Sequence, residues 1–185
     1  GSIYGVAKGV KLIPVKVLGD NGSGTNAGVI AGLDWAADNH LPGKLAVGNM
    51  SLGGGGSTAL DDAVRRCVAD GIVMAVAAGN DNRDVNNILL PTSPARVQQA
   101  ITVGAVDKFN NINSYSNGTP EQVDFYTPGT VKAILPGGTP TTVAGTSASD
   151  AQFKMQVQAL DSAAAAVTGI PVVATATAGC WFRSS

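Results

Sequence analysis

The chain has 185 residues, of which 44% are hydrophobic and 14% charged, a composition typical of one globular domain rather than a disordered chain. Lys and Arg total 12 against 13 Asp and Glu, so no excess of cations is available for phosphates, and we expect no nucleic-acid partner. The longest apolar runs, such as residues 71–78, are far shorter than the roughly 20 residues that span a bilayer, so we expect no membrane partner. The two cysteines, Cys67 and Cys180, have neither metal-ligand spacing nor a disulfide-dense pattern, and they leave the redox compartment open.

The first part of the chain predicts a strand, a helix and a second strand. Residues 10–18 (VKLIPVKVL) are rich in β-branched residues and are followed by turn residues. Residues 27–40 have apolar side chains at helical spacing, with Thr25 or Asn26 available as the N-cap. Residues 45–52 (LAVGNMSL) then predict a buried strand, so the helix is a crossover between two strands.

Four consecutive glycines at 53–56 predict a backbone that is either flexible or closely approached by another group, before a second helix at 57–71. The ends of this helix carry the usual signals, with Ser57 or Thr58 as the N-cap, Asp61 and Asp62 in the first turn, and Gly71 at the stop.

The apolar segment at 72–80 predicts a third strand of the kind that is buried on both faces of a parallel sheet, and residues 100–107 predict a fourth strand. The alternation of strands and helices therefore predicts an α/β fold, a parallel sheet with helices on both faces. Residues 109–140 are rich in Asn, Gly, Pro and Thr and predict loops and edge strands. The composition changes near residue 150, so we divide the chain into a domain at 1–149 and a divergent C-terminal segment at 150–185. Residues 148–167, which cross this boundary, are compatible with a helix.

The stretch GSGTNA at 22–27 fits the loose Gly-x-Gly-x-x-Gly/Ala pattern of dinucleotide-binding loops. In that fingerprint the first glycine follows the strand directly, whereas here Gly19, Asp20 and Asn21 intervene after Leu18. A nucleotide-binding doubly wound domain is therefore an alternative that depends on this pattern alone.

Residues 49–57 follow the second predicted strand, residues 76–82 follow the third, and residues 143–149 lie further along the chain; we expect two of these three segments to meet at one edge of the sheet. In a parallel sheet the loops at the carboxyl ends of the strands gather on one edge, where ligands bind. Ser147 would begin a helix whose N–H groups favour an anion, and Asn80 could donate an amide hydrogen bond to the same point. A serine oxygen and an amide placed in this way would suit attack on a carbonyl group.

Eight blocks follow one another along residues 4–149: YGVAKGVKLIPVKVLGDNGSG, GVIAGLDWAADNH, NMSLGGG, AVAAGNDN, SPARVQQAITVGAVD, SYSNG, VDFYTPG and VAGTS. In this order they resemble the subtilases, specifically the proteinase K-like branch that includes aqualysin-type secreted enzymes. The resemblance implies a three-layer subtilisin-like fold, peptide or protein substrates, secretion, and serine endopeptidase activity through an acyl-enzyme that needs no cofactor for catalysis.

The resemblance also implies roles for individual residues. Ser147 matches the nucleophile and Asn80 the oxyanion-hole amide. Asp124 matches a carboxylate that holds a structural calcium ion, with carbonyl groups near Gln98 and Ala100. The matches to substrate-binding segments are Ser51, Leu52 and Gly53 on one side of the substrate, Gly22, Ser23 and Gly24 on its other side, and Ala77, Ala78 and Gly79 in the wall of the primary specificity pocket.

The pattern departs from the family in two places. The catalytic Asp and His motifs of the subtilases precede the block that begins at Tyr4, and this sequence does not contain them, so we expect a missing N-terminal segment. The single histidine, His40, falls in a predicted surface turn, and we expect it to be a satisfied or solvent-facing residue and not the base. After Ser147 the family has a buried, apolar central helix, whereas residues 150–158 of this sequence include several polar side chains that would be costly to bury.

A serine that has no adjacent proton acceptor is a poor nucleophile. We therefore predict a subtilisin-like serine endopeptidase domain, incomplete relative to the family, that hydrolyses peptides little or not at all as this isolated chain. The alternative from another class is a non-catalytic peptide-binding module derived from a subtilase, in which Ser147 is inert.

Overall fold

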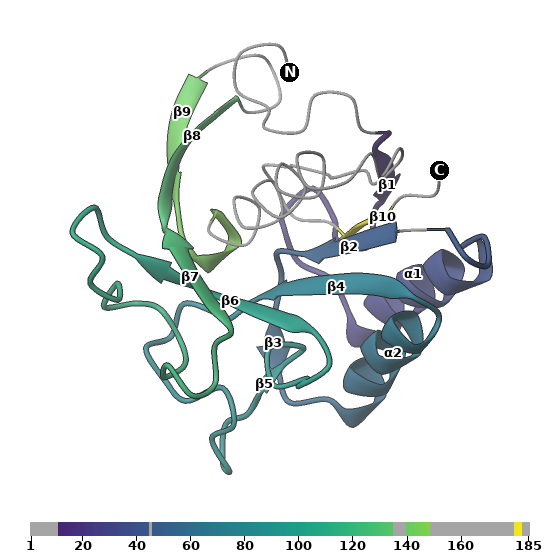
Figure 1. The fold of residues 1–185 in the computed structure, drawn as a ribbon, viewed down its shortest axis with the longest axis horizontal. Helices are drawn as coiled ribbons and strands as arrows, with labels where there is room; N and C mark the ends of the chain where they lie inside the picture. Colours follow the sequence, from purple (N-terminus) through teal and green to yellow (C-terminus); the bar gives the residue numbers. More distant parts are fainter. Residues whose placement is uncertain (1–10, 45, 135–139, 149–179, 183–185) are drawn as a thin grey trace.

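The computed structural model describes residues 11–44, 46–134, 140–148 and 180–182 (Figure 1). Its main sheet has six strands in the order β1-β10-β2-β4-β6-β7, and two small sheets pair β3 with β5 and β8 with β9. The strands are β1 (Ile13–Val15), β2 (Ala46–Met50), β3 (Gly54–Gly55), β4 (Ile72–Ala77), β5 (Thr92–Ser93), β6 (Ile101–Val106), β7 (Phe125–Pro128), β8 (Thr130–Ile134), β9 (Pro140–Ala144) and β10 (Cys180–Phe182).

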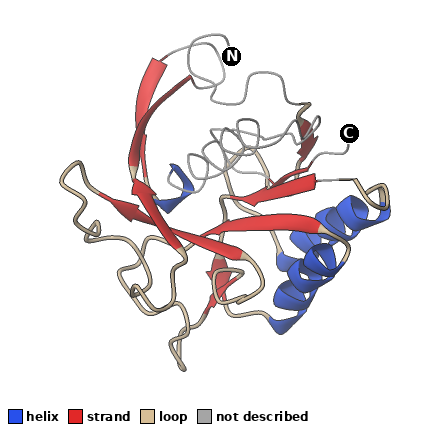
Figure 2. Cartoon of the chain, in the orientation of Figure 1, coloured by secondary structure: helices blue, strands red, loops and turns tan. Residues whose placement is uncertain are grey.

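Helices α1 (Asn26–Asp38) and α2 (Thr58–Ala69) lie side by side next to the sheet (Figure 2). Each begins at a hydroxyl N-cap, because the side chain of Thr25 accepts from the Gly28 N–H and that of Ser57 accepts from the Leu60 N–H. Of the alternative caps that the sequence allows, the structure therefore selects Thr25 and Ser57.

The parallel part of the sheet consists of β2, β4, β6 and β7. A buried apolar cluster joins the two helices to β2 and β4, with Leu33, Val64, Met50 and Met74 at most 1% exposed. This arrangement confirms the α/β fold with a parallel sheet, and α1 and α2 supply one helical layer. The helix expected at 148–167 lies almost wholly outside the described residues, apart from the helical turn at 146–148.

The strand β10 was not predicted. It pairs antiparallel with β1 on one side and with β2 on the other, so β1 and β2 run parallel to each other one strand apart. The predicted strand at 10–18 is reduced to three residues, and the strand predicted at 72–80 ends at Ala77.

The glycine run at 53–56 contains a short strand. Gly54 and Gly55 pair with Thr92 and Ser93, and a Cβ atom at Gly56 would meet the ring of Pro91. The close approach expected at these glycines is therefore present, although part of the run is regular. In the 109–140 region, the predicted edge strands correspond to β7 and to the β8–β9 ribbon.

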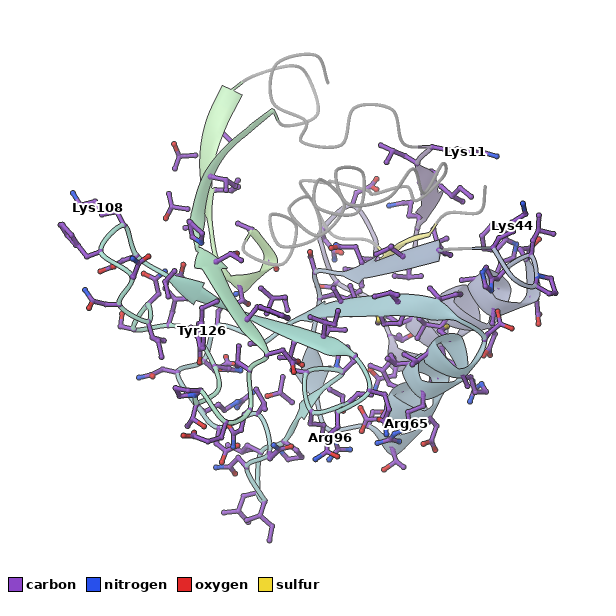
Figure 3. All side chains as sticks on the ribbon, viewed as in Figure 1. Lys11, Lys44, Arg65, Arg96, Lys108 and Tyr126 are labelled. Carbon is purple, nitrogen blue, oxygen red and sulfur yellow. The ribbon has the colours of Figure 1, made fainter. Side chains whose placement is uncertain are left out.

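Of the labelled cations, Lys11 and Lys44 lie at the upper right of the view, Arg65 and Arg96 below them, and Lys108 at the far left (Figure 3). Within the described residues, no helix has both the length and the apolar character needed to cross a bilayer.

Candidate active site

The site lies where β9 leads into a short helical turn, drawn in green beside the end of β2 (Figure 1). Gly145 connects the two with φ +138°, a value that favours glycine, and its N–H donates to Gly129 O at 2.9 Å. A Cβ atom at Gly145 would lie 3.4 Å from the side-chain nitrogen of Asn80. The backbone therefore reaches this approach to Asn80 through a residue with no side chain.

Asn80 is fastened to the start of the helical turn. Its Oδ1 atom accepts from the backbone N–H of Thr146 at 2.9 Å and from the Thr146 hydroxyl at 3.1 Å. The Thr146 hydroxyl oxygen in turn accepts from the Gly79 N–H at 3.1 Å, and Thr146 is fully buried. Because a backbone N–H can only donate, the atom that faces it must be Oδ1, which fixes the orientation of the amide.

The same orientation leaves the NH2 group of Asn80 on the other side, where it donates to no described residue, and Asn80 is exposed. Ser147 is the second residue of the helical turn, a position at which the backbone N–H has no intrahelical acceptor. Two neutral N–H donors, from the side chain of Asn80 and the backbone of Ser147, are the groups that an oxyanion hole uses. The arrangement is chemically suited to stabilise an oxyanion on a group bound to Ser147.

The Ser147 side chain contacts the segment that follows β2. Its Oγ donates to Ser51 O at 3.2 Å, and the Ser51 hydroxyl donates to Ser147 O, also at 3.2 Å. Asn49 supports this pair, because its Nδ2 donates to the Ser51 hydroxyl at 2.8 Å. The proton of Ser147 therefore points to a carbonyl group, which hydrogen-bonds a hydroxyl but does not act as a general base.

His40 has two partners of its own. Its Nδ1 lies 2.7 Å from Asp70 Oδ2 and its Nε2 lies 2.7 Å from Lys44 O, and the residue is 9% exposed. Burial lowers the pKa of His40, but the hydrogen bonds to Lys44 O and to Asp70 outweigh it and raise the pKa above 6.5. The expectation of a satisfied histidine is confirmed.

His40 also lies at the wrong end of the sheet. Lys44 precedes β2 and Ser51 follows it, so their carbonyl groups lie beyond opposite ends of a five-residue strand that is about 16 Å long at 3.3 Å per residue. Cys67, another nucleophilic side chain, is fully buried, and this burial raises the pKa of its thiol to about 11. Ser147 is therefore the candidate nucleophile of the described chain.

The residues matched to the specificity pocket lie at the end of β4. Ala77 is the last residue of that strand, and both it and Ala78 are buried. Gly79 follows with φ +104°, and a Cβ atom there would meet the side-chain nitrogen of Asn117. These three residues stand directly before Asn80 in the chain.

The two segments matched to the sides of the substrate lie in different surroundings. Ser51 and Leu52 are half-buried, Gly53 is exposed, and Leu52 packs against the main apolar cluster. Gly22, Ser23 and Gly24 form an exposed turn that is closed by the hydrogen bond from Gly19 N to Ser23 O.

The glycine turn does not have the geometry of a dinucleotide loop. Six residues separate the end of β1 at Val15 from Gly22, and the hydroxyl of Thr25 already caps the N-terminus of α1. In the dinucleotide fingerprint the strand leads directly into the glycines, and the open helix N-terminus meets the pyrophosphate. The structure therefore offers no support for nucleotide binding here.

Asp124 lies beside the start of β6, on the exposed surface. Its Oδ2 accepts from the Thr102 N–H at 2.7 Å, and its own N–H donates to Thr102 O at 3.0 Å. In the parts of the chain that are described, no group of three or more His, Cys, Asp or Glu side chains could hold a metal ion. A cation at Asp124 would therefore depend on one carboxylate together with carbonyl groups, which is an acceptable donor set for calcium.

Two further residues of the site were not singled out from the sequence. Thr146 joins Asn80 to the helical turn, and Asn117 is fully buried against the loop that carries Asn80. Thr146 stands directly before Ser147, whereas Asn117 shows only the Asn-Gly signal of a turn.

Comparisons with known proteins agree with this geometry. The model of the subtilase family matches residues 1–177. The "Extracellular serine proteinase" of Thermus sp. (strain Rt41A) is 55% identical over 129 residues, which are 70% of this chain and 30% of that protein. The "Subtilisin-like protease 4" of Trichophyton tonsurans is 45% identical over 152 residues, 80% of this chain and 37% of that protein.

A solved structure, "Crystal structure of a cold adapted subtilisin-like serine proteinase", matches with a TM-score of 0.76 and 44% identity, and the match covers 87% of this chain and 56% of that chain. This chain spans about a third of the length of the curated relatives that it matches. The order of the sequence blocks, the parallel sheet and the match of the family model lead to one conclusion: the chain belongs to the subtilase family.

Proposed function

We propose that this chain is the nucleophile-bearing part of a secreted subtilisin-like serine endopeptidase, and that alone it hydrolyses peptides little or not at all. The observation that carries the proposal is that Asn80 Oδ1 accepts from the N–H and the hydroxyl of Thr146, the residue directly before Ser147, so the NH2 group of Asn80 is left as a donor. Ser147 Oγ would attack the carbonyl carbon of the scissile peptide bond. The Asn80 NH2 group and the Ser147 N–H would stabilise the oxyanion that forms.

In this proposal, substrate binding uses the segments that the resemblance to the family assigns to it. Ser51, Leu52 and Gly53 would pair with the substrate backbone on one side, and Gly22, Ser23 and Gly24 would lie on the other. Backbone pairing of this kind tolerates many sequences. The buried Ala77 and Ala78, with Gly79, would form the wall of the primary pocket.

The low activity would follow because the hydrogen-bond acceptor of the Ser147 hydroxyl is a carbonyl group and not a general base. Its Oγ donates to Ser51 O, and His40, the single histidine of the chain, is held by Asp70 and Lys44 O at the other end of β2. Loss of the triad partners costs several orders of magnitude in rate, although oxyanion stabilisation and binding leave a residual rate over water. Secretion is supported by the names of relatives such as the extracellular proteinase of Thermus.

The contact between Ser147 Oγ and a carbonyl group also favours a second candidate, a peptide-binding module without chemistry. Hydrolysis of an activated peptide ester, with and without added imidazole as an external base, distinguishes the two. The endopeptidase proposal predicts a slow hydrolysis that rises with imidazole and is lost in Ser147→Ala. A rate that is equal in the chain and in Ser147→Ala at every imidazole concentration, together with peptide binding, would establish the binding module.

We also propose a structural calcium ion at Asp124. Its carboxylate is fixed by the Thr102 N–H, and Gln98 and Ala100 lie in the turn that leads into β6. Calcium would draw this turn and the start of β7 together. The ion would take no part in catalysis.

A further inference from the structure

Residues 78–83 form an irregular loop directly after β4, and this loop contains Asn80. Among the described residues, no backbone hydrogen bond joins two members of the loop. The backbone of the loop is instead hydrogen-bonded to other segments, because the Ala78 N–H donates to Val103 O and the Asn82 N–H donates to Tyr115 O, each at 3.0 Å. The position of Asn80 is therefore set by the residues around the loop.

Asn117 makes the largest share of these contacts from a single side chain. Its Oδ1 accepts from the Asp81 N–H at 2.8 Å and from the Arg83 N–H at 3.1 Å, and its Nδ2 donates to Ala78 O at 3.1 Å. Its backbone N–H donates to Gly79 O at 2.9 Å. These four hydrogen bonds reach the loop on both sides of Asn80.

The fit requires an asparagine. Asn117 is 0% exposed, so an unmatched donor or acceptor at this position would stay unsatisfied away from water. Aspartate would keep the acceptor that faces Asp81 and Arg83, but it would place a second oxygen against Ala78 O. Leucine would leave two N–H groups and one carbonyl group without partners.

We propose that Asn117 is a positioning residue that presets the side chain of Asn80 for oxyanion stabilisation by holding the 78–83 loop in one conformation. The inference rests on the proposed function for its catalytic consequence. The hydrogen bonds of Asn117 to the loop go to residues 78, 79, 81 and 83, so it acts on Asn80 through the backbone on either side. Thr146 holds the amide of Asn80, and Asn117 holds the backbone of the loop on both sides of Asn80.

The first test is amide hydrogen exchange of the wild-type chain by NMR. Leu89 and Leu90 provide a matched control, because their N–H groups donate to Oδ1 of Asn87 in the same double-acceptor arrangement, but in an exposed loop. We expect the amides of Asp81 and Arg83 to exchange at least about 100-fold more slowly than those of Leu89 and Leu90. Equal exchange rates for the two pairs would overturn the proposal.

The second test is a double-mutant cycle on the Ser147-dependent hydrolysis of an activated peptide ester. Asn117→Asp should lower kcat by about tenfold or more with KM within about twofold, and Asn87→Asp, which adds the same charge, should not. In an Asn80→Ala background, Asn117→Asp should cause no further loss. A loss of the same size in that background would refute action through Asn80.

The two tests separate this inference from the proposed function. If the ester hydrolysis does not depend on Ser147, the proposed function fails, and the exchange rates of Asp81 and Arg83 still decide whether Asn117 fixes the loop. If Asn117→Asp does not fold, the exchange rates of Asp81 and Arg83 in the wild-type chain still test whether Asn117 fixes the loop.

Discussion

The side-chain oxygen of Asn80 accepts hydrogen bonds from both the backbone N–H and the hydroxyl of Thr146, at 2.9 and 3.1 Å. The oxygen of the amide therefore holds the helical turn, while the NH2 group donates to no described residue and is the part that we propose acts in catalysis. Because the two halves can be altered separately, the roles of Asn80 in stability and in catalysis can be measured separately.

Asn80→Asp should retain the two bonds to Thr146 and lose the NH2 donor. We expect it to lower kcat for the activated ester by about 10²–10³, the usual cost of one oxyanion-hole donor, with a small change in the free energy of unfolding. Asn80→Ala should lower kcat similarly and also destabilise the fold by about 1–2 kcal/mol, because it removes the bonds to Thr146. Equal stability losses in the two variants, measured by urea unfolding, would contradict this division.

Asp61 and Arg96 form a partly buried ion pair between α2 and the turn after β5. Arg96 Nε donates to Asp61 Oδ2 at 2.7 Å, and the two side chains are 26% and 3% exposed. Arg96→Ala would leave the Asp61 carboxylate buried without its partner, so we expect a loss of about 2–4 kcal/mol in urea unfolding.

The pair Arg65 and Asp62 on the same helix is the matched control for Arg96→Ala. Their contact measures 2.6 Å, but the side chains are 42% and 55% exposed. Solvent screens this pair, so Arg65→Ala should change the free energy of unfolding by at most about 0.5 kcal/mol. Losses of similar size for the two arginine variants would show that burial does not decide the strength of these pairs.

The pKa of His40 is raised in the folded chain, so protonation of His40 stabilises the fold. This contribution is complete below the unfolded pKa near 6.5, and it is lost as the pH rises above 6.5 through the folded pKa. His40→Asn has no group that titrates here, and its stability should therefore fall less between pH 6 and pH 9 than that of the wild type. Parallel stability curves for the two proteins over this range would contradict the assignment.

The proposed calcium ion predicts a chelator effect that depends on Asp124. Calcium should raise the melting temperature of the wild-type chain, and EDTA should reverse the increase, because an ion that binds only the folded state stabilises it. Asp124→Asn should abolish the response to calcium while keeping a side-chain acceptor for the Thr102 N–H. A calcium response that is unchanged in Asp124→Asn would place the ion elsewhere or remove the proposal.

Local sequence signals predicted much of the fold. The N-caps Thr25 and Ser57 and the apolar runs that became β4 and β6 depend on neighbouring residues, so periodicity and composition were sufficient to find them. The strand β10 and the β3–β5 pair depend on residues distant in sequence, and no local pattern marks them.

The candidate site shows the same limit. The resemblance to a family located Ser147 and Asn80, and the structure brings them together through Thr146. Asn117 could not be found from the sequence, because asparagine before glycine is common in turns for conformational reasons alone. Its importance appears only when its four hydrogen bonds to the 78–83 loop are seen.

Within the described part of the chain, the Ser147 hydroxyl donates to the Ser51 carbonyl group and to no general base, and we propose that Asn80 and the Ser147 N–H form its oxyanion site. The most direct test is the intact mass of the purified chain after exposure to a fluorophosphonate, which labels only a serine with an activated oxygen. A subtilisin-like relative with its complete catalytic residues serves as the positive control, and Ser147→Ala as the negative one. We predict no adduct on this chain, whereas one phosphonate per chain that is absent from Ser147→Ala would show that a base reaches Ser147 and would contradict the account.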